Sequence, residues 1–228
     1  MALVDLSHTI EDGMVTYKGL PAPKIQDVLS REASRQHYAE GTEFSITTIQ
    51  LCSNTGTYLD TPFHRFADAP DLSAIPLAKL ANLPAVCLDA DSWLNGQSNQ
   101  HAITKGFFQK ELNGKTDVKG LAVLVRTSWS LCWGKDEYWS GRHPFLTEDA
   151  AQWLAEQQVA LVGIDSYNID DTAGGHRPVH SRLLKDGILI IEHMTNLHAL
   201  PPAPFRFFAV PPKIAGMGTF PVRVFAVL

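Results

Sequence analysis

Polar residues that could carry out chemistry gather in the segment N-T-G-T-Y-L-D-T-P-F-H. They are an amide, a phenol, a carboxylate and an imidazole, from Asn54, Tyr58, Asp60 and His64. Such groups transfer protons and bind metal ions. All four have even numbers, so their side chains share one face wherever the chain stays extended, and Pro62 keeps Thr61 extended. The alternative interpretation is a polar strand end that runs into a surface loop.

A second segment, His176–Leu200, adds another carboxylate. Glu192 follows the apolar run I-L-I-I, so its side chain starts inside the fold. A buried carboxylate needs a metal ion, a cation or several hydrogen-bond donors. Two interpretations are therefore open: Glu192 binds a metal ion, or it forms a salt bridge with Arg177 or Arg182.

Together, the two segments resemble the cyclase-like metal hydrolases, the family that includes bacterial kynurenine formamidase and isatin hydrolase. The first motif of that family, H-x-G-T-H-x-D-x-P-x-H, aligns with Asn54–His64. Asn54 and Tyr58 replace its two leading histidines. The second motif matches a further set of residues, namely His180, Gly187, Ile188, Glu192 and Asn196-Leu197. The resemblance spans nearly the whole chain.

The resemblance implies a divalent metal site. Asp60, His180 and Glu192 are expected to hold one ion, zinc or manganese, with a coordination position left for water. His64 is expected to act as the acid–base, with Asp60 and Tyr58 as further catalytic residues. The other metal site of the family lacks ligands here, because Asn54 offers a neutral oxygen and Tyr58 ligates well only when ionised. We therefore expect one ion per chain, or none if both sites are lost.

These residues predict a metal-dependent hydrolase of a small amide, lactam or lactone, resembling an arylformamide hydrolase. The ion would activate water and His64 would move the proton. A second interpretation is a metal-free lyase, dehydratase or cyclase in small-molecule metabolism, with Tyr58 as a proton donor. A third is a non-catalytic protein that binds a small molecule, and the retention of His64, His180 and Glu192 counts against it.

Substrate binding is assigned to Tyr17, Asn54 and Trp129. In the family, a loop near the start of the chain carries an aromatic residue into the active site, and Tyr17 is the matching residue. Tyr17, Trp129 and Trp133 favour an aromatic carbonyl compound as substrate. The alternative interpretation is that Tyr17 is an exposed loop residue and Trp129 a core residue.

Apolar runs predict the strands that position these residues. They are Val4–Ile10, Phe44–Cys52, Pro84–Ala90, Leu121–Arg126, Val159–Ile164, Ile188–Ile191, Arg206–Val210 and Val222–Val227. Continuous apolar runs indicate strands buried on both faces. Thr147 is placed to cap a helix, and another helix is expected over Ile103–Leu112. The strand–helix–strand order around Thr147 predicts a parallel β-α-β unit, with Asp165 at the carboxyl end of the sheet, where ligands bind.

The predicted fold class is α/β with a mixed sheet, and no linker divides residues 1–228. The family resemblance implies a single cyclase-like domain with a swivelling β/β/α architecture and a barrel-like sheet. Ser30–Gly41 is polar. It is expected to form a loop or short helix that is mobile or lies at a contact between subunits.

Composition narrows the partners and the location. The 228 residues are 45% hydrophobic and 19% charged, with a net charge of −5, as in ordinary globular proteins. The chain has no basic run, so neither nucleic acid nor a membrane is expected as a partner. The start M-A-L-V-D lacks a signal-peptide pattern, and the cysteines Cys52, Cys87 and Cys132 show no C-x-x-C spacing, so we expect a cytoplasmic protein with reduced thiols. The expected partners are a small-molecule substrate and, from the resemblance, further copies of the chain in a homodimer or homotetramer.

Overall fold

The computed structural model describes residues 1–15, 17–96, 101–112 and 117–228. Its main element is a curled, nine-stranded mixed sheet. In order of neighbours, the strands are β1 (Leu3–Asp5), β13 (Phe225–Val227), β11 (Phe205–Phe208), β5 (Leu83–Asp89), β7 (Ala122–Arg126), β9 (Leu161–Ile164), β10 (Leu189–Glu192), β4 (Tyr58–Asp60) and β12 (Thr219–Pro221). The central strands β5, β7, β9 and β10 are parallel, and the outer pairs are antiparallel. The predicted α/β class with a mixed sheet is therefore confirmed.

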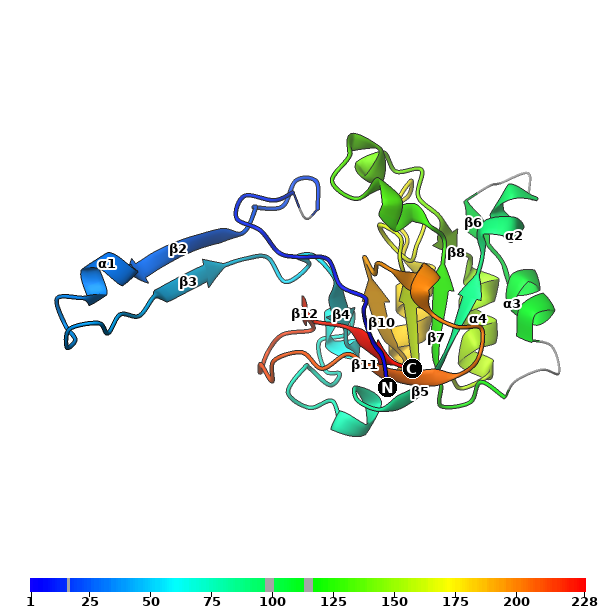
Figure 1. Ribbon diagram of the computed structural model, residues 1–228. Coiled ribbons are helices and arrows are strands. Elements are labelled where there is room, and N and C mark those ends of the chain that lie inside the picture. The colour runs from blue at the N-terminus through cyan, green and yellow to red at the C-terminus, as the bar shows by residue number, and fades with distance from the viewer. Residues whose placement is uncertain (16, 97–100, 113–116) are drawn as a thin grey trace.

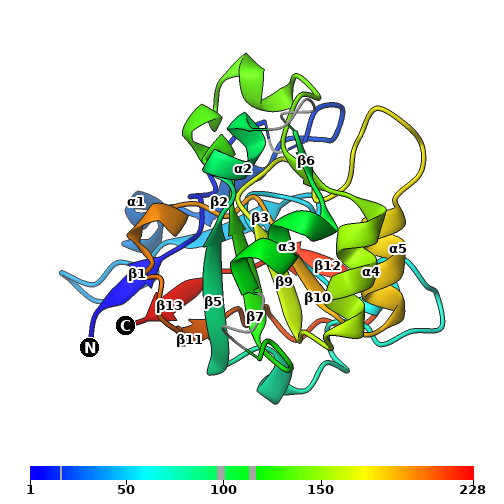
Figure 2. The ribbon, with the colours of Figure 1, turned by 90° about the vertical axis from the view of Figure 1, so that its right-hand side faces the viewer.

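Three helices cover one face of the sheet (Figure 2). They are α3 (Lys105–Leu112), α4 (Glu148–Glu156) and α5 (Pro178–Lys185). In β7, Val123 and Val125 join the core beneath the helices, while Leu124 belongs to a second core on the opposite face. This alternation explains why the strand reads as a continuous apolar run, because both of its faces are buried.

The helix predicted after Thr147 is α4, which lies between the parallel strands β7 and β9 as expected. Thr147 occupies the N-cap position, but its hydroxyl does not cap the helix. Its oxygen lies within hydrogen-bond distance of two other acceptors, the carbonyl oxygen of Ile103 at 3.2 Å and the Asp149 carboxylate. The cap position was predicted correctly and the capping contact was wrong, because the nearby carbonyl and carboxylate compete for the hydroxyl.

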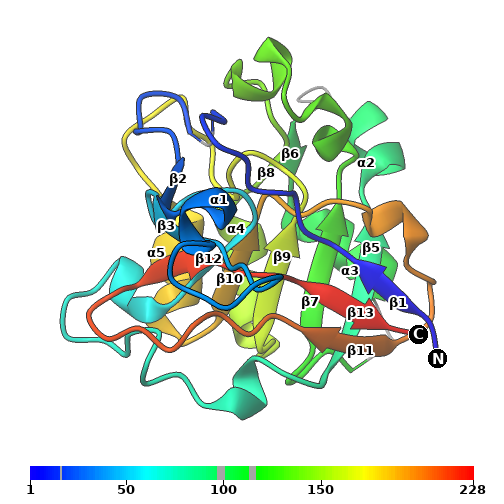
Figure 3. The same ribbon diagram turned by 60° about the vertical axis from the view of Figure 1, so that its left-hand side comes forward.

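The remaining described elements are short. Beside the helices lie α2 (Asp91–Asn95), β6 (Ala102–Ile103) and β8 (Phe145–Leu146), and 3-10 turns form η1 (Pro62–His64), η2 (Leu77–Lys79), η3 (Trp129–Cys132), η4 (Asp136–Trp139) and η5 (Leu197–Ala199). The last predicted strand, Val222–Val227, is shorter than expected, since β13 begins only at Phe225 and β12 has already ended at Pro221. Figure 3 shows β1, β13 and β11 side by side, with both chain ends at this edge. Within the described parts of the chain, no helix is both long and apolar enough to cross a bilayer.

An arm projects from the body on the side away from the helices (Figure 1). It consists of the antiparallel pair β2 (Lys24–Leu29) and β3 (Ile46–Gln50), with the short helix α1 (Arg31–Ser34) near its tip. The strand predicted over Phe44–Cys52 is β3, and Ser30–Gly41 contains α1 as the predicted short helix. Every residue of β3 is exposed. The arm therefore lies outside both cores.

The predicted ribbon from Asn54 to His64 is not extended throughout. Gly56 has a φ of 62°, which turns the chain from the arm into β4. Thr61 is extended with φ −103° and ψ 167°, as the following proline requires. Pro62 then begins the 3-10 turn η1, so the extended stretch ends at Thr61 and His64 reaches the site through a turn.

Candidate active site

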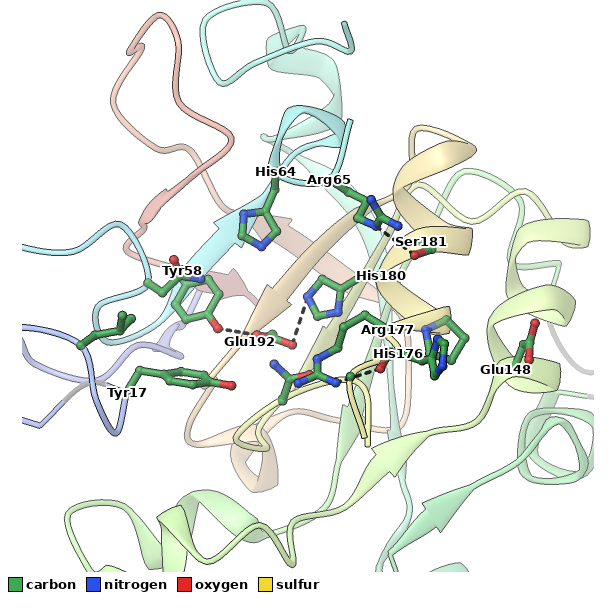
Figure 4. A pocket seen from close by; sticks show the side chains of 15 residues that line it. Tyr17, Tyr58, His64, Arg65, Glu148, His176, Arg177, His180, Ser181 and Glu192 are labelled. Atoms are coloured by element: carbon green, nitrogen blue, oxygen red, sulfur yellow. Dashed lines mark hydrogen bonds and ion pairs between the residues drawn. The ribbon is translucent and has the colours of Figure 1, made fainter. Parts of the chain in front are cut away.

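The candidate site is a pocket of about 860 Å³ between the arm side of the sheet and the first turn of α5. Figure 4 shows Tyr58 and His64 facing Glu192 and His180 across it. The predicted residues Tyr17, Asn54, Tyr58, His64, His180 and Glu192 all line this pocket. Asp60 lies beneath it and is fully buried.

Strand register brings two of the site's pairs together. Tyr58 lies opposite Glu192 in the β4–β10 pair, and its hydroxyl donates to that carboxylate. Asp60 lies opposite Thr219 in the β4–β12 pair. Because directly opposed side chains in an antiparallel pair share one face, β4 presents Tyr58 and Asp60 to the same site, as their spacing predicts.

Thr219 links Asp60 to His64. The Thr219 hydroxyl donates to Asp60 Oδ1 at 2.5 Å, and its oxygen lies 2.6 Å from His64 Nδ1. A hydroxyl has a single proton, and an ionised carboxylate can only accept. His64 Nδ1 must therefore be the donor to Thr219, which leaves Nε2 of a neutral His64 as an acceptor. The His64 side chain is 35% exposed, so the pocket can reach it.

His180 is fixed from behind by Asp170. The Asp170 carboxylate accepts from His180 Nδ1 at 2.6 Å and from the backbone N–H groups of Val179 and His180, at 2.8 and 3.0 Å. The same carboxylate thus begins helix α5 and orients the ring. His180 Nε2 then points toward Asp60 Oδ2 at 3.7 Å and Glu192 Oε1 at 3.5 Å. A carboxylate behind a histidine is typical of metal sites.

The buried cluster carries more negative than positive charge. Burial by itself lowers the pKa of His180, but the carboxylates of Glu192, Asp170 and Asp60 outweigh it and raise the pKa to about 10. Burial, and then the repulsion from Asp60, raises the pKa of Glu192. Three carboxylates around one imidazole are stable in a buried place only with a further cation or proton.

A divalent cation fits these residues. Asp60 Oδ2 is buried and, within the described residues, has no hydrogen-bond partner. Asp60, His64 and His180 each offer a ligand atom, and these atoms lie within 4.8 Å of one another. Glu192, the third predicted ligand, lies 3.5 Å from His180 Nε2 but does not belong to this group of three. The third member of the group is His64. The donor set of carboxylate oxygen and imidazole nitrogen suits zinc and manganese alike.

Glu192 is held by neutral donors. Its Oε1 accepts from the backbone N–H of Ile169 at 2.6 Å, and its Oε2 accepts from the Tyr58 hydroxyl. No described arginine pairs with it, so the alternative of a salt bridge to Arg177 or Arg182 is not found; Arg182 pairs with Asp186 at 2.8 Å. Burial and then the charges of Glu192 and Asp60 raise the pKa of Tyr58 well above its ordinary value. Tyr58 is therefore a hydrogen-bond donor to Glu192 in this structure.

Two predicted residues lie elsewhere. Trp129 does not line the pocket; its ring packs against Tyr138, with the ring centroids 6.5 Å apart. Asp165, expected to face a ligand at the end of the sheet, is buried and accepts from Thr127 N and Oγ1, at 2.6 and 2.7 Å. Both residues shape the loop after β7. Tyr17, by contrast, lies at the pocket, with its ring 4.7 Å from that of Tyr167.

Sequence reasoning missed Asp170 and Thr219. Asp170 follows β9 in a loop of mixed polar residues, where no short-range pattern marks it. Thr219 is a single threonine in a late strand, and only the pairing of β4 with β12 brings it to Asp60. The start of α5 could have indicated Asp170. A helix that begins at Pro178 needs an acceptor for its first backbone N–H groups, and a nearby aspartate can supply one.

The comparisons with known proteins agree with this site. A family model described as "Putative cyclase" matches residues 4–171. A kynurenine formamidase from Salinibacter ruber is 26% identical over 98% of this chain and 96% of that protein. The solved structure of isatin hydrolase A from Ralstonia solanacearum has a TM-score of 0.80 and 25% identity, covering 99% of this chain and 91% of that chain. A predicted metal-dependent hydrolase from Bacillus stearothermophilus has a TM-score of 0.75 and 27% identity, covering 99% and 97%.

The chain belongs to the cyclase family, since the family model covers most of its length. The similarity to the solved structures extends over nearly the whole chain and confirms the predicted cyclase-like fold with its curled sheet.

Proposed function

We propose that this protein is a metal-dependent hydrolase of a small amide, lactam or lactone. The observation that carries the proposal is the unpartnered, buried Asp60 Oδ2 facing His180 Nε2 beside a pocket that His64 lines. Relatives named as a formamidase, an isatin hydrolase and a metal-dependent hydrolase support the same class of reaction. Asp60, His180 and Glu192 would hold one zinc or manganese ion.

A bound divalent ion would supply positive charge that polarises the substrate carbonyl and makes water more acidic. The side chains do the proton transfer. His64 Nε2 takes the proton of the attacking water and returns it to the leaving nitrogen or oxygen. Thr219 and Asp60 keep the Nδ1 proton in place during this cycle. Tyr58 remains protonated and holds Glu192 in position.

Metal content per chain, measured by elemental mass spectrometry on untagged protein after loading with zinc or manganese, tests this proposal. About one ion per chain is expected, strongly reduced in Glu192→Ala and Asp60→Asn. His198→Ala serves as the control, because His198 is an exposed histidine outside the pocket. No retained ion under either loading condition would refute the metal mechanism.

His64 can be assigned by the same measurement. As the acid–base it can be changed to alanine without loss of the ion, while formamide hydrolysis falls by about 100-fold or more. If His64→Ala loses the ion as completely as Asp60→Asn, then His64 is a ligand, as its place in the three-residue group allows.

A metal-free lyase or cyclase is the second candidate, favoured by one observation: the Tyr58 hydroxyl lies in the pocket lining and donates a hydrogen bond to Glu192. Such an enzyme would keep its activity in the presence of a chelator and lose it in Tyr58→Phe. The hydrolase would instead lose its activity when a chelator removes the metal ion.

A further inference from the structure

One wall of the pocket carries two arginines that lack an acidic partner. Arg65 follows η1, and Arg177 precedes the first turn of α5; both line the pocket. Within the described residues, neither arginine forms an ion pair with a carboxylate, whereas other arginines such as Arg126 and Arg182 do. Figure 4 shows His180 between Arg65 and Arg177, with Tyr17 and Tyr58 on the other side of the pocket.

Both guanidinium groups are held in place by neutral contacts. Arg65 Nε donates to Ser181 Oγ at 3.1 Å, and its guanidinium lies 5.3 Å from the Phe66 ring centroid. Arg177 Nη1 donates to the carbonyl oxygens of Gly174 and His176, at 2.7 and 2.8 Å, and of Asp171 at 3.2 Å. These contacts use one nitrogen of each fork. The other nitrogens of each guanidinium are left for a ligand.

Helix geometry places the arginines beside the reacting groups. Ser181 N donates to the carbonyl oxygen of Arg177 at 3.0 Å, so Arg177 and Ser181 stand one helical turn apart. Residues at this spacing lie on one helix face, and His180 belongs to the same turn. The turn that aims His180 at Asp60 therefore also positions Arg177 and, through Ser181, Arg65.

The charge of this wall calls for an anion. The acidic residues in the pocket lining are Glu148 on α4 and Glu192, and among the described residues neither forms an ion pair with these two guanidiniums. The planar fork of arginine matches a carboxylate, with charge-assisted hydrogen bonds to both oxygens. We propose that Arg65 and Arg177 bind a carboxylate of the substrate, so that the preferred substrate is an anionic amide whose scissile carbonyl lies at His64 and His180. This proposal rests on the hydrolase function.

The test compares charged and neutral substrates of the same shape. Hydrolysis of an N-formyl aromatic amine adds water across the C–N bond and gives formate and the free amine. The N-formylaminobenzoates (ortho, meta and para) carry a carboxylate, and the matching N-formylnitroanilines carry a neutral group of the same shape. The ratio of kcat/KM between each pair, measured in the wild type and in Arg65→Met, cancels the intrinsic reactivity of each compound.

The ratio for the best isomer should favour the carboxylate in the wild type and fall by roughly 10- to 100-fold in Arg65→Met, the usual range for a lost charge-assisted hydrogen bond. Arg65→Lys should restore part of it, since the charge remains and the fork is lost. Arg31→Met, at the tip of the arm, removes the same charge far from the pocket and should leave the ratio unchanged. Arg177→Lys should also lower the ratio of kcat/KM values. Lysine is chosen here because it keeps the positive charge that contacts the loop carbonyl oxygens.

The outcomes separate the two proposals. If formyl compounds are hydrolysed and the ratio is the same in Arg65→Met and the wild type, the carboxylate site is wrong and the hydrolase stands. If Arg65→Met alters only the release of product, kcat changes by the same factor for the carboxylate and the nitro compound of a pair. That result also overturns the substrate assignment. If nothing is hydrolysed, the hydrolase is wrong, and calorimetric titration with acetamidobenzoate decides the site: a 10-fold or greater loss of affinity in Arg65→Met supports it, and equal affinity refutes it.

Discussion

Thr219 is the residue on which the proton chemistry of His64 depends. Its hydroxyl forms hydrogen bonds with both Asp60 Oδ1 and the His64 ring, which lie 3.8 Å apart, and it fixes which ring nitrogen carries the proton. A residue that acts through a histidine in this way affects the proton transfer more than substrate binding.

Replacing Thr219 by valine keeps its shape and removes the hydroxyl. We expect kcat to fall by roughly 10- to 100-fold with KM little changed, because outer hydrogen bonds to a site typically contribute this much. The pH dependence of kcat should also change, since His64 loses its fixed tautomer. Thr219→Ser, which keeps the hydroxyl, should recover most of the activity. A valine variant with wild-type kcat and an unchanged pH profile would contradict this role.

Asp165 predicts a pH effect on stability that is independent of the site. Burial raises its pKa from the ordinary 3.8 to about 6, despite the hydrogen bonds from Thr127 and Ser128. The folded protein therefore holds this proton more tightly than the unfolded chain. The resulting stabilisation is complete below the unfolded pKa and is lost as the pH rises through the folded pKa.

The free energy of unfolding of the wild type, relative to Asp165→Asn, should decrease by about 2 kcal/mol between pH 4 and pH 7. Denaturant unfolding of both proteins across this range measures the difference. Equal pH dependence in the two proteins would show that Asp165 stays ionised throughout.

At the scale of the elements, the backbone of η1 is in direct contact with the backbone of Gly218, just before β12. A Cβ atom on Gly218 would lie 2.2 Å from the backbone nitrogen of His64 and 2.5 Å from its Cα. The Gly218 carbonyl also accepts from Thr61 N at 2.8 Å. This close backbone approach is what brings the turn with His64 against Thr219.

Gly218→Ala should therefore displace η1, lower the free energy of unfolding by about 1–3 kcal/mol and reduce activity strongly. Thermal unfolding and formamide hydrolysis measure the two effects. Gly174→Ala is the control, because a Cβ there meets nothing within 4 Å. If both glycine variants have the same stability and the same activity, the close backbone approach at Gly218 is not needed for function.

The positions of the strands and helices could be predicted from the sequence better than the contacts between them. β7 and β10 were found from continuous apolar runs, because burial on both faces leaves no polar alternation, and α4 was found from its apolar stripe. The turn at Pro62, the hydrogen bonds of Thr219 and Asp170, and the place of Trp129 were not predicted. They depend on which strands become neighbours, and a local pattern contains no information on pairing across the sheet.

At the scale of the whole molecule, the arm is incomplete by itself. Val28, Ile46 and Ile49 are 65, 51 and 54% exposed, and a two-stranded ribbon without a core is marginally stable. The expected homodimer or homotetramer stays a prediction, and we propose that a second copy of the chain covers these side chains.

Light scattering coupled to size-exclusion chromatography should then give a multiple of the 25.1 kDa chain mass. Ile46→Lys with Ile49→Lys should shift the protein toward the mass of one chain, since each lysine would have to be buried without a partner. Leu77→Lys changes a leucine on the body that is 67% exposed, and it should leave the mass unchanged. A wild type that elutes as a single chain would refute the proposal.

The position of β4 also has a consequence for how the chain acquires its structure during synthesis. Its two neighbours are β10 and β12, which the ribosome makes long after residues 58–60. Until then, the backbone groups of β4 remain unpaired and Asp60 lacks Thr219. Distant pairings of this kind fold slowly, on the scale of milliseconds to seconds. Refolding should therefore proceed through the parallel strands and their helices first, with enzymatic competence regained in the last kinetic phase.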